Sequence, residues 1–369
     1  MDLELSSDQR DLRALARQAL DDRAPLTLAR AFLDQDPDAT PLHGLLTELG
    51  WYAVGVDPDD GFGLPGLVLL AEQAGAHAAP TALVDSAVAA RIAQHLEGGL
   101  ADRVAAGEVT TALAVLEAGA DWSLAGLATT LQGAPGAPRL DGEKLGVQHG
   151  ATADALLVVA DAGGEPSVAL LECTTPDVTI TPAPGVDPAA ATANVELAGA
   201  VVEHGAVLTG DAAAGVLREA FAVGALATAA EGLGAASAAL DLAVSYALER
   251  QQFGRPIGSF QALKHVLADA HVDRESAWSS VLYAAAAVDE HLPGADEVAA
   301  IACAYGARAS RAVVETALQV FGGIAFTWEH DSHLLQRRVL SCERRFGDAL
   351  HHERRLGDRL AARGAEVTA

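Results

Sequence analysis

The sequence contains little cysteine and few aromatic residues. Among 369 residues there are three cysteines, and phenylalanine, tryptophan and tyrosine together make up 4%. Cys173, Cys303 and Cys342 are odd in number, far apart and not in metal-ligand spacing. This usage is typical of a reduced, cytoplasmic protein, so we expect neither disulfides nor a cysteine-bound metal to organise the fold.

Positive charge is also scarce, because 24 lysines and arginines face 50 aspartates and glutamates, which gives a net charge of −26. Nucleic acid and an anionic membrane surface would repel such a chain, so neither is expected as a partner. The start, Met1–Ser6, lacks the basic-then-apolar order of a signal peptide, and no apolar run is long enough to span a bilayer. A small anion bound in a locally basic pocket is still compatible with this charge.

Half of the residues are hydrophobic, which is enough to build two or three domains. The first hundred residues have helical periodicity, clearest at 8–20. Short β-rich runs follow from about Val109, as at 155–160, 167–172 and 177–181, and turn clusters separate them. From about Asp211 the pattern is again helical. The sequence therefore predicts a mainly α, α+β protein with a helical domain at 1–108, a small antiparallel β-barrel or sandwich at 109–212 and a helical bundle at 213–369.

The stretch 246–265 reads as the end of one helix, a turn and the start of another. Gly254 and Pro256 supply the stop signals, and the corner presents Arg250 beside Phe253. An arginine at a helix end beside an aromatic ring can hold a diphosphate with two hydrogen bonds while the ring lies against apolar ligand surface. The alternative is a solvated helix-end charge and a core aromatic.

Two further helices are predicted in this part of the chain. One follows the corner, because four residues have the i, i+3, i+4, i+7 spacing of an amphipathic helix, namely Leu263, Val266, Leu267 and Ala270. The other spans roughly 296–321 and should stop at the pair Gly322 and Gly323, a natural C-terminal cap.

The corner reads Arg, two residues, Phe-Gly, then Pro-Ile-x-x-Phe-Gln, and this resembles the flavin-binding corner of the acyl-CoA dehydrogenase family. The resemblance covers most of the chain. Residues 319–328 resemble the family's Gln-x-x-Gly-Gly signature, which meets the dinucleotide part of a flavin held mainly by the neighbouring subunit. The resemblance therefore implies that the FAD contacts come from five residues, namely Arg250, Phe253, Gln319, Gly322 and Gly323.

Other parts of the family pattern are missing. Residues 116–121 stand where the family has Thr-Glu-Pro, and no Gly-Ser-Asp follows them. The tryptophan that packs near the family's flavin aligns with Gly146, which cannot supply an aromatic wall. Trp122 and His149 are available to take over parts of this role, but we favour a core tryptophan and a surface histidine.

The catalytic base is missing as well. Dehydrogenation between the α and β carbons of an acyl thioester needs a carboxylate to remove the α-proton. The family keeps this glutamate in one of two places, which correspond here to Gly224 and Phe346. Glu231 is the nearest substitute, and at 1.5 Å rise per residue it lies roughly 10 Å further along the helix. No residue is therefore assigned as the base, with Glu231 as the alternative.

These matches and losses favour a subunit of a flavin-dependent acyl-CoA dehydrogenase that is inactive alone. It would contribute cross-subunit FAD contacts to a homologous partner, as in the family's α2β2 steroid side-chain dehydrogenases. Two alternatives stay open: a self-sufficient FAD enzyme that uses Glu231, and a non-redox scaffold or acyl-CoA-binding descendant. A steroid acyl group is suggested only by the resemblance of residues 327–330, so the acyl group is left open.

The last part of the chain is rich in charge. We expect Glu329, His330 and Asp331 to cap a helix and form surface ion pairs. His330 and His333 have no supporting ligands, so no metal site is predicted. Residues 342–355 are expected to form a charged helix that is solvated or lies at a subunit contact.

Overall fold

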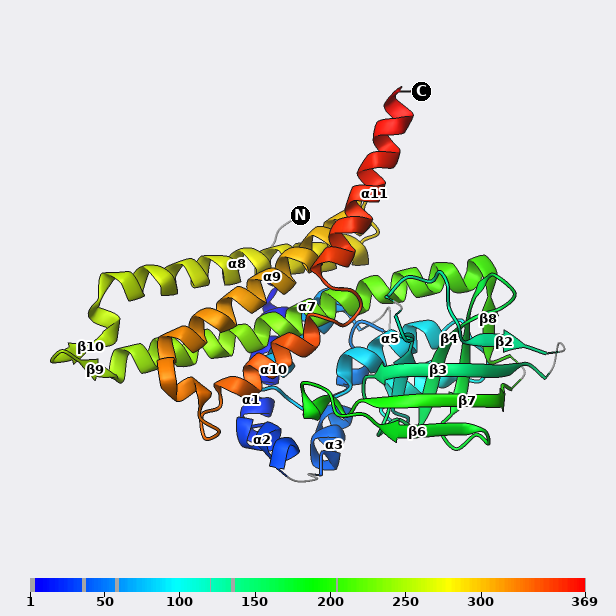
Figure 1. The fold of residues 1–369 in the computed structure, drawn as a ribbon, viewed down its shortest axis with the longest axis horizontal. Coiled ribbons are helices and arrows are strands. Elements are labelled where there is room, and N and C mark those ends of the chain that lie inside the picture. The colour runs from blue at the N-terminus through cyan, green and yellow to red at the C-terminus, as the bar shows by residue number, and fades with distance from the viewer. Residues whose placement is uncertain are drawn as a thin grey trace. The chain divides into compact units, whose positions relative to one another are not determined.

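The computed structural model describes residues 4–34, 38–56, 60–119, 121–133, 137–203 and 205–368 (Figure 1). Its contacts divide the chain into two compact units. Unit 1 comprises residues 1–37, 64–79 and 225–369, and unit 2 comprises residues 38–63 and 80–224. Helix α7 (Gly210–Glu249) is continuous through the boundary between them. The mainly α, α+β class predicted from the sequence is confirmed.

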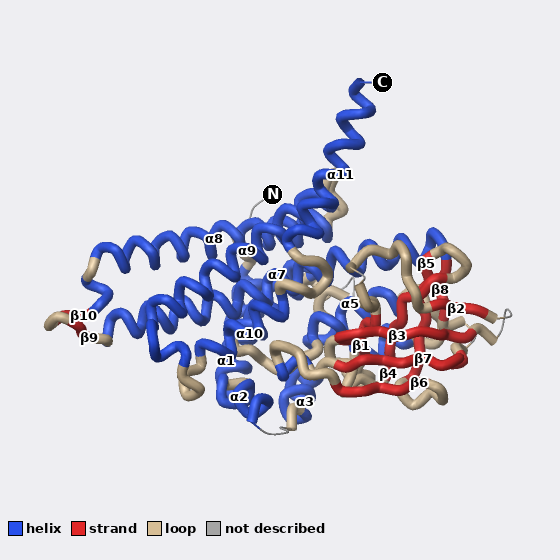
Figure 2. The backbone as a smooth tube through the Cα atoms, viewed as in Figure 1, coloured by secondary structure: helices blue, strands red, loops and turns tan. Residues whose placement is uncertain are grey.

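Unit 2 combines short helices with the strands, which are drawn red in Figure 2. Its helices are α3 (Thr40–Glu48), α5 (Leu83–Ala93) and α6 (Leu100–Ala105). Its strands are β1 (Thr111–Ala114), β2 (Thr130–Gln132), β3 (Arg139–Val147), β4 (Ala155–Asp161), β5 (Pro166–Glu172), β6 (Val178–Pro182), β7 (Ala193–Val201) and β8 (Val207–Thr209). The three β-rich runs expected from the sequence are therefore β4, β5 and β6.

These strands form one sheet in the order β6-β7-β3-β2-β4-β5-β8, with β1 also paired to β4. Most pairs are antiparallel, but β4 runs parallel to both β1 and β2. The expectation of a wholly antiparallel sheet was thus wrong at β4. Residues 155–160 of this strand are buried without alternation, which is typical of a strand covered on both faces. Leu156, Val158 and Ala160 join the core of the sheet.

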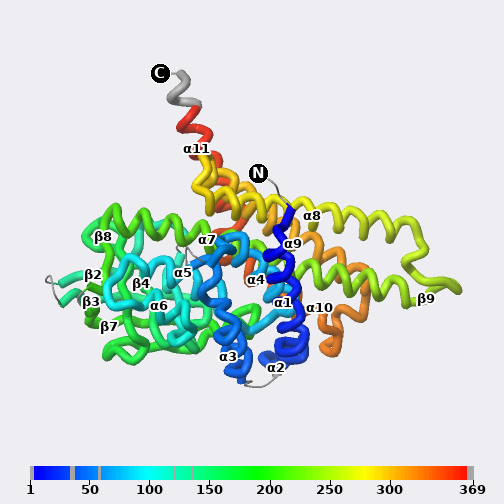
Figure 3. The backbone as a smooth tube through the Cα atoms, turned by 180° about the vertical axis from the view of Figure 1, so that it is seen from behind, coloured from blue at the N-terminus to red at the C-terminus, as the bar shows by residue number. Residues whose placement is uncertain are grey.

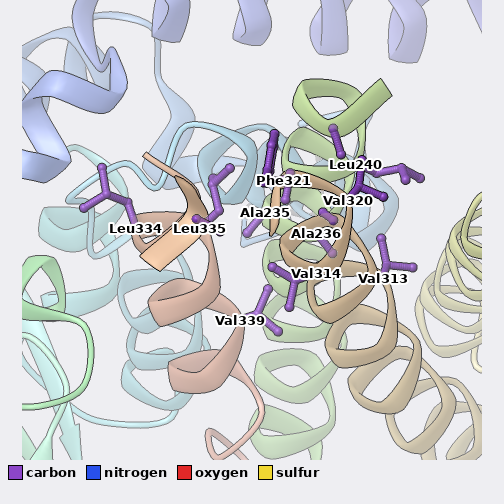
Figure 4. Packing of buried hydrophobic residues seen from close by; sticks show 14 of the residues in the cluster. Ala235, Ala236, Leu240, Val313, Val314, Val320, Phe321, Leu334, Leu335 and Val339 are labelled. Carbon is purple, nitrogen blue, oxygen red and sulfur yellow. The ribbon is translucent and has the colours of Figure 1, made fainter. Parts of the chain in front are cut away.

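Unit 1 consists of helices. They are α1 (Ser7–Arg23), α2 (Leu26–Asp34), α4 (Gly63–Ala76), the second part of α7, α8 (Gln261–Asp289), α9 (Ala295–Phe321), α10 (Ser332–Cys342) and α11 (Ala349–Thr368). Helices α7, α8 and α9 run alongside one another (Figure 1). In the core between α7, α9 and α10, small α7 residues such as Ala235 face Val313, Phe321 and Leu335 (Figure 4).

Helices α4 and α7 cross at very close range because glycine lies on both sides of the contact. A Cβ built on Gly75 would lie 1.8 Å from the carbonyl oxygen of Glu231, and one on Gly234 would lie 1.8 Å from that of Glu72. No side chain fits at either position, so these glycines set the distance between the two helices. Figure 3, the view from behind, shows helices α4 and α1.

Helix α7 is long and apolar enough to cross a membrane by length and composition alone, although no such run was expected from the sequence. Within its most apolar window, 83% of the residues are buried inside the protein. Apolar residues all round a helix are typical of a core helix. We therefore interpret α7 as a buried core helix.

The helices flanking the corner follow the predicted pattern with one exception. In α8, Leu263 and Leu267 pack against the core of unit 1 and Ala270 is buried, but Val266 is 44% exposed. At 3.6 residues per turn, Val266 lies about 60° from Leu263 and at the edge of the apolar face. Helix α9 ends at Phe321 and Gly322 caps it with φ +65°, as the sequence predicted.

Candidate functional site

The corner after α7 is a tight hairpin with an exposed aromatic residue at its tip. Strands β9 (Gln251–Gln252) and β10 (Arg255–Pro256) pair through Gln252 and Arg255, which leaves Phe253 and Gly254 as a two-residue loop. Both loop residues have positive φ, at 54° and 75°, as a type I′ turn requires. The Phe253 side chain is 91% exposed. It is therefore not the core aromatic of the alternative interpretation.

A phenylalanine in this conformation is unfavourable, since the left-handed region is costly for bulky residues. Contacts within the hairpin hold it in place. The Phe253 ring lies edge-on to Phe260 at 6.2 Å, and the Arg255 guanidinium lies 4.1 Å above the same Phe260 ring. The backbone amide of Ile257 donates to the carbonyl oxygen of Arg250 at 2.8 Å. The hairpin thus presents a ring on a strained backbone to its surroundings, beside an exposed arginine.

The end of α9 offers backbone without side chains. Gln319 is exposed in the last turn, and Gly322 and Gly323 begin the short helix η4 (Gly322–Phe326). A Cβ built on either glycine would meet no atom within 4 Å. The peptide groups of both glycines can therefore be approached closely, which suits a phosphate-bearing ligand.

Aromatic packing brings these two segments to the same end of unit 1. The ring of Tyr246, one turn before Arg250, lies 5.5 Å from the ring of Phe321, which directly precedes Gly322. The five residues predicted to contact FAD therefore occupy one end of the α7–α8–α9 bundle. We call this group, Arg250, Phe253, Gln319, Gly322 and Gly323, the hairpin corner.

Neither position where the family keeps its base carries an acid here. Gly224 is buried within α7, and Phe346 is 3% exposed with φ +56°. Glu231, the substitute considered for the base, is buried, and both of its carboxylate oxygens are engaged. Its Oε1 accepts from Arg338 and its Oε2 from Arg345, each at 2.9 Å. Arg338 also donates to the carbonyl oxygens of residues 78 and 79.

This Arg338–Glu231–Arg345 triad was not foreseen from the sequence. Residues 342–355 were expected to form one charged helix, solvated or at a subunit contact, and the single helix was wrong: α10 ends at Cys342, a turn follows, and α11 begins at Ala349. Arg345 and His352 are buried. The one signal was Glu231 itself, because a carboxylate within an apolar helix needs a buried countercharge. Nothing in the sequence indicated which arginines would supply it.

In unit 2, the positions that line the family's own flavin pocket are also altered. Gly146 is exposed with φ +59°, and its amide donates to Oδ1 of Asn194 at 3.0 Å. A tryptophan would be strained in this conformation. Trp122 is half-buried and packs edge-on against Phe221 at 5.7 Å.

The expectation of a surface position for His149 was wrong. The side chain is buried, and its Nε2 lies 3.8 Å from Oδ2 of Asp85 on α5. A buried imidazole needs polar neighbours, and the buried carboxyl of Asp85 provides one.

A buried ion pair stabilises the stretch that replaces the family's Thr-Glu-Pro. The ammonium of Lys144 lies 2.5 Å from Oε1 of Glu117, whose carboxylate also accepts from the amides of Ala128 and Thr129. Burial alone would raise the pKa of Glu117, but these hydrogen bonds outweigh it and lower the pKa to about 2. Burial lowers the pKa of Lys144, although the hydrogen bond and the charge of Glu117 act to raise it. We interpret this pair as structural, since Lys144 has no exposed surface.

A cleft of about 900 Å³ lies elsewhere in unit 1, between α1, α4, α7 and α8. Its charges are largely paired: Arg13 binds Glu72 with two hydrogen bonds, and Arg274 contacts Glu275 and Asp241. Trp278 lies 5.3 Å from the Arg13 guanidinium. The cleft contains no residue of the hairpin corner.

One of the charged residues after the corner forms an ion pair. Asp331 pairs with Arg30 at 2.6 Å, as expected, although its side chain forms no capping hydrogen bond to α10. Nδ1 of His330 lies 2.9 Å from Oγ of Ser332, and burial lowers the pKa of His330. Within the described ranges, no group of three or more histidine, cysteine or acidic residues is arranged to hold a metal ion.

Comparison with known proteins gives consistent matches. Residues 214–354 match the family model described as "Acyl-CoA dehydrogenase, C-terminal domain". The acyl-CoA dehydrogenase IpdE2 of Mycolicibacterium smegmatis is 45% identical over 132 residues, which cover 36% of this chain and 40% of that protein. The chain thus matches less than half the length of this relative.

Two solved structures match over nearly the whole chain. The ChsE4-ChsE5 complex from Mycobacterium tuberculosis has a TM-score of 0.87 at 26% identity, covering 98% of this chain and 99% of the matched chain. A variant of the Tcur3481-Tcur3483 steroid ACAD has the same TM-score at 28% identity, covering 97% and 99%.

Proposed function

Because this chain belongs to the acyl-CoA dehydrogenase family, we propose that it is a non-catalytic subunit of a flavin-dependent acyl-CoA dehydrogenase. In this proposal the chain supplies no base. Its hairpin corner contacts an FAD that is held mainly by a homologous partner subunit. The substrate of the assembled complex would be an acyl-CoA thioester.

The observation that carries the proposal is the contrast between the corner and the base positions. Phe253 stands almost fully exposed at the tip of a strained turn, and the peptides at Gly322 and Gly323 are open. A strained, exposed aromatic is costly unless a ligand or partner uses it. The base positions, Gly224 and Phe346, carry no carboxylate, and the substitute Glu231 is paired with two arginines.

The corner residues suit the diphosphate and adenosine part of FAD. Arg250 is exposed at the helix end, where its guanidinium can donate two hydrogen bonds to a diphosphate. The Phe253 ring offers an apolar surface, and the two glycines allow backbone to approach phosphate oxygens. Bound FAD would supply the hydride acceptor of the reaction, while the α-proton would be removed by a carboxylate of the partner.

Two structural matches support a heteromeric steroid-type enzyme. The ChsE4-ChsE5 structure is named as a complex, and the Tcur3481-Tcur3483 protein is named as a steroid ACAD. An α2β2 heterotetramer with one FAD per heterodimer fits a chain that has the corner without the base. The acyl group would then be a steroid side chain, and the setting would be steroid degradation.

The proposal is tested by producing the chain alone and together with a homologous subunit that has an intact base. We expect little flavin on the chain alone and a stoichiometric yellow complex that oxidises an acyl-CoA. A homo-oligomer with one flavin per chain and full activity would overturn the proposal.

A corner variant and a matched control test the flavin contact itself. Arg250→Ala should lower the flavin content of the complex, whereas Arg359→Ala should not. Arg359 is a partly exposed arginine that pairs with Asp296 at the opposite end of α9, about 40 Å from Gly322. Equal flavin content in the two variants would count against the corner.

The alternative of a self-sufficient enzyme that uses Glu231 finds less support in the geometry. A general base must keep a free lone pair within reach of its proton, and each oxygen of this carboxylate accepts from a guanidinium. The non-redox alternative predicts assembly with a partner that is indifferent to Arg250→Ala.

A further inference from the structure

Three buried polar side chains line one small cavity of unit 1. They are Thr228 of α7, Ser310 of α9 and His352 of α11, and each is nearly inaccessible to solvent. Oγ1 of Thr228, Oγ of Ser310 and Nδ1 of His352 have no hydrogen-bond partner among the described residues. Buried polar atoms in native proteins are nearly always satisfied, so three such atoms around one cavity need a common explanation.

The cavity has the size and lining of a water site. Its volume is about 20 Å³, and a single water needs at least roughly 10–15 Å³ by this measure and two to four polar partners. Alanine and glycine of α7, at Ala225, Ala229 and Gly232, form the small-residue part of the wall. A larger ligand does not fit in this volume.

The protonation state of the His352 ring determines whether its Nδ1 needs a hydrogen-bond donor or an acceptor. Burial lowers the pKa of His352 to about 4, and His351 and Arg355 add to this effect, so the ring is neutral at pH 7. A hydrogen bond with the Gly347 backbone opposes the shift, as a ring N–H donating to a carbonyl would. A neutral ring that donates through one nitrogen accepts through the other, so Nδ1 requires a donor.

We propose that one ordered water molecule binds in this cavity, donating to Nδ1 of His352 and bonding to the hydroxyl groups of Thr228 and Ser310. The water joins α7, α9 and α11 at a single point. Arg345 and Gly347 line the same cavity, so the water lies beside the loop where the family carries one of its two bases. This site is independent of the function proposed above, because it requires neither flavin nor a partner.

A crystal structure of the full chain at high resolution tests the proposal directly. The expected result is one well-ordered water within 3.2 Å of at least two of the three atoms, as normal hydrogen-bond lengths require. A dry cavity, with both hydroxyls donating to carbonyls one turn back in their own helices, would overturn it.

A double-mutant cycle tests the shared partner in solution. Thr228→Val and Ser310→Ala each remove one hydroxyl that the water uses. Once one hydroxyl has been removed, removing the other should change the unfolding constant by a smaller factor. We expect the unfolding constant of the double variant, measured in urea, to differ about 2-fold or more from the product of the single effects. Thr228→Ser keeps the hydroxyl, so in this background Ser310→Ala should change the unfolding constant by the same factor as in the wild-type chain.

Ser237→Ala provides the matched control. Ser237 also lies on α7, but its hydroxyl already donates to the carbonyl oxygen of Leu233 at 2.7 Å. Its effect on the unfolding constant should be independent of Ser310→Ala, so the double variant should show the product of the two single effects. If the Thr228 and Ser310 pair behaves in the same independent way, the two hydroxyls share no water and the proposal is wrong.

Discussion

Glu231→Gln separates a structural role of this residue from a catalytic one. Glu231 is buried between Arg338 and Arg345, and each ion pair measures 2.9 Å. At this separation, Coulomb's law gives each pair an attraction of about 6 kcal/mol at an effective dielectric constant near 20, part of which offsets the cost of burying the charges. Glutamine removes the charge and leaves two buried guanidinium groups uncompensated. We expect the free energy of unfolding to fall by about 3–5 kcal/mol, the usual cost of breaking a buried ion pair.

Urea denaturation at pH 7 measures this loss, because urea does not screen charge. The loss should persist in 1 M salt, since buried pairs are screened weakly. Arg345→Gln should cost less than Glu231→Gln, because Glu231 then retains Arg338 as a single countercharge. Glu353→Gln is the matched control: its pair with Arg308 is exposed on both sides, so its loss should stay below about 1 kcal/mol and shrink with salt.

The same variant also tests the alternative function. If Glu231 were the base, Glu231→Gln would abolish turnover in the complex while stability and flavin absorbance stayed normal. A stability change below about 0.5 kcal/mol together with lost turnover would therefore refute the structural reasoning. Loss of stability with normal turnover in the remaining folded complex would exclude Glu231 from catalysis.

Three further predictions concern other parts of the chain. The folded-state pKa of His352, about 4, lies below the ordinary 6.5, so the unfolded chain binds the extra proton and stability falls as pH drops from 6.5 to 4. Relative to His352→Gln, the wild-type chain should lose about 3 kcal/mol in this window, measured by urea titrations at each pH. Arg250→Ala should weaken flavin binding in the complex by about 10- to 100-fold in a fluorescence titration, and unchanged affinity would remove Arg250 from the site. Gly234→Ala should destabilise unit 1 by about 1–3 kcal/mol or more in thermal unfolding, whereas Gly357→Ala, in an exposed helix with open space, should be neutral or slightly stabilising.

The sequence predicted what depends on local pattern. The switch from helical to β-rich texture and back follows from periodicity, and the end of α9 follows from the glycine pair at Gly322 and Gly323. The two parts of the hairpin corner, at 250–253 and at 319–323, were each predicted as a motif, because the residues within each part are close in sequence. Its exposure was not settled, since Arg250 and Phe253 fit a solvated charge and a core aromatic equally well by pattern alone.

What the sequence did not predict depends on contacts between distant segments. The close approach of α4 to α7 requires Gly75 and Gly234, which are separated by more than 150 residues in a chain where glycine is common. The partners of Glu231 lie more than 100 residues away, in a segment whose charge run reads as solvated. Periodicity reports the face of a helix that is buried, but it carries no information on the element that buries it.

The part of the family's site that this chain resembles and the part that it lacks differ in charge and in exposure. An active base region must expose a carboxylate to a substrate, which costs stability because the charge is desolvated without a fixed partner. Here the carboxylate of Glu231 has been given two fixed partners, and a buried phenylalanine occupies a base position. The hairpin corner has the opposite character, because an exposed Phe253 in a left-handed turn is costly in the free chain. Only a bound ligand or partner offsets that cost, so the corner should become more ordered and more protected from hydrogen exchange when the complex forms, while the region around Glu231 should not change.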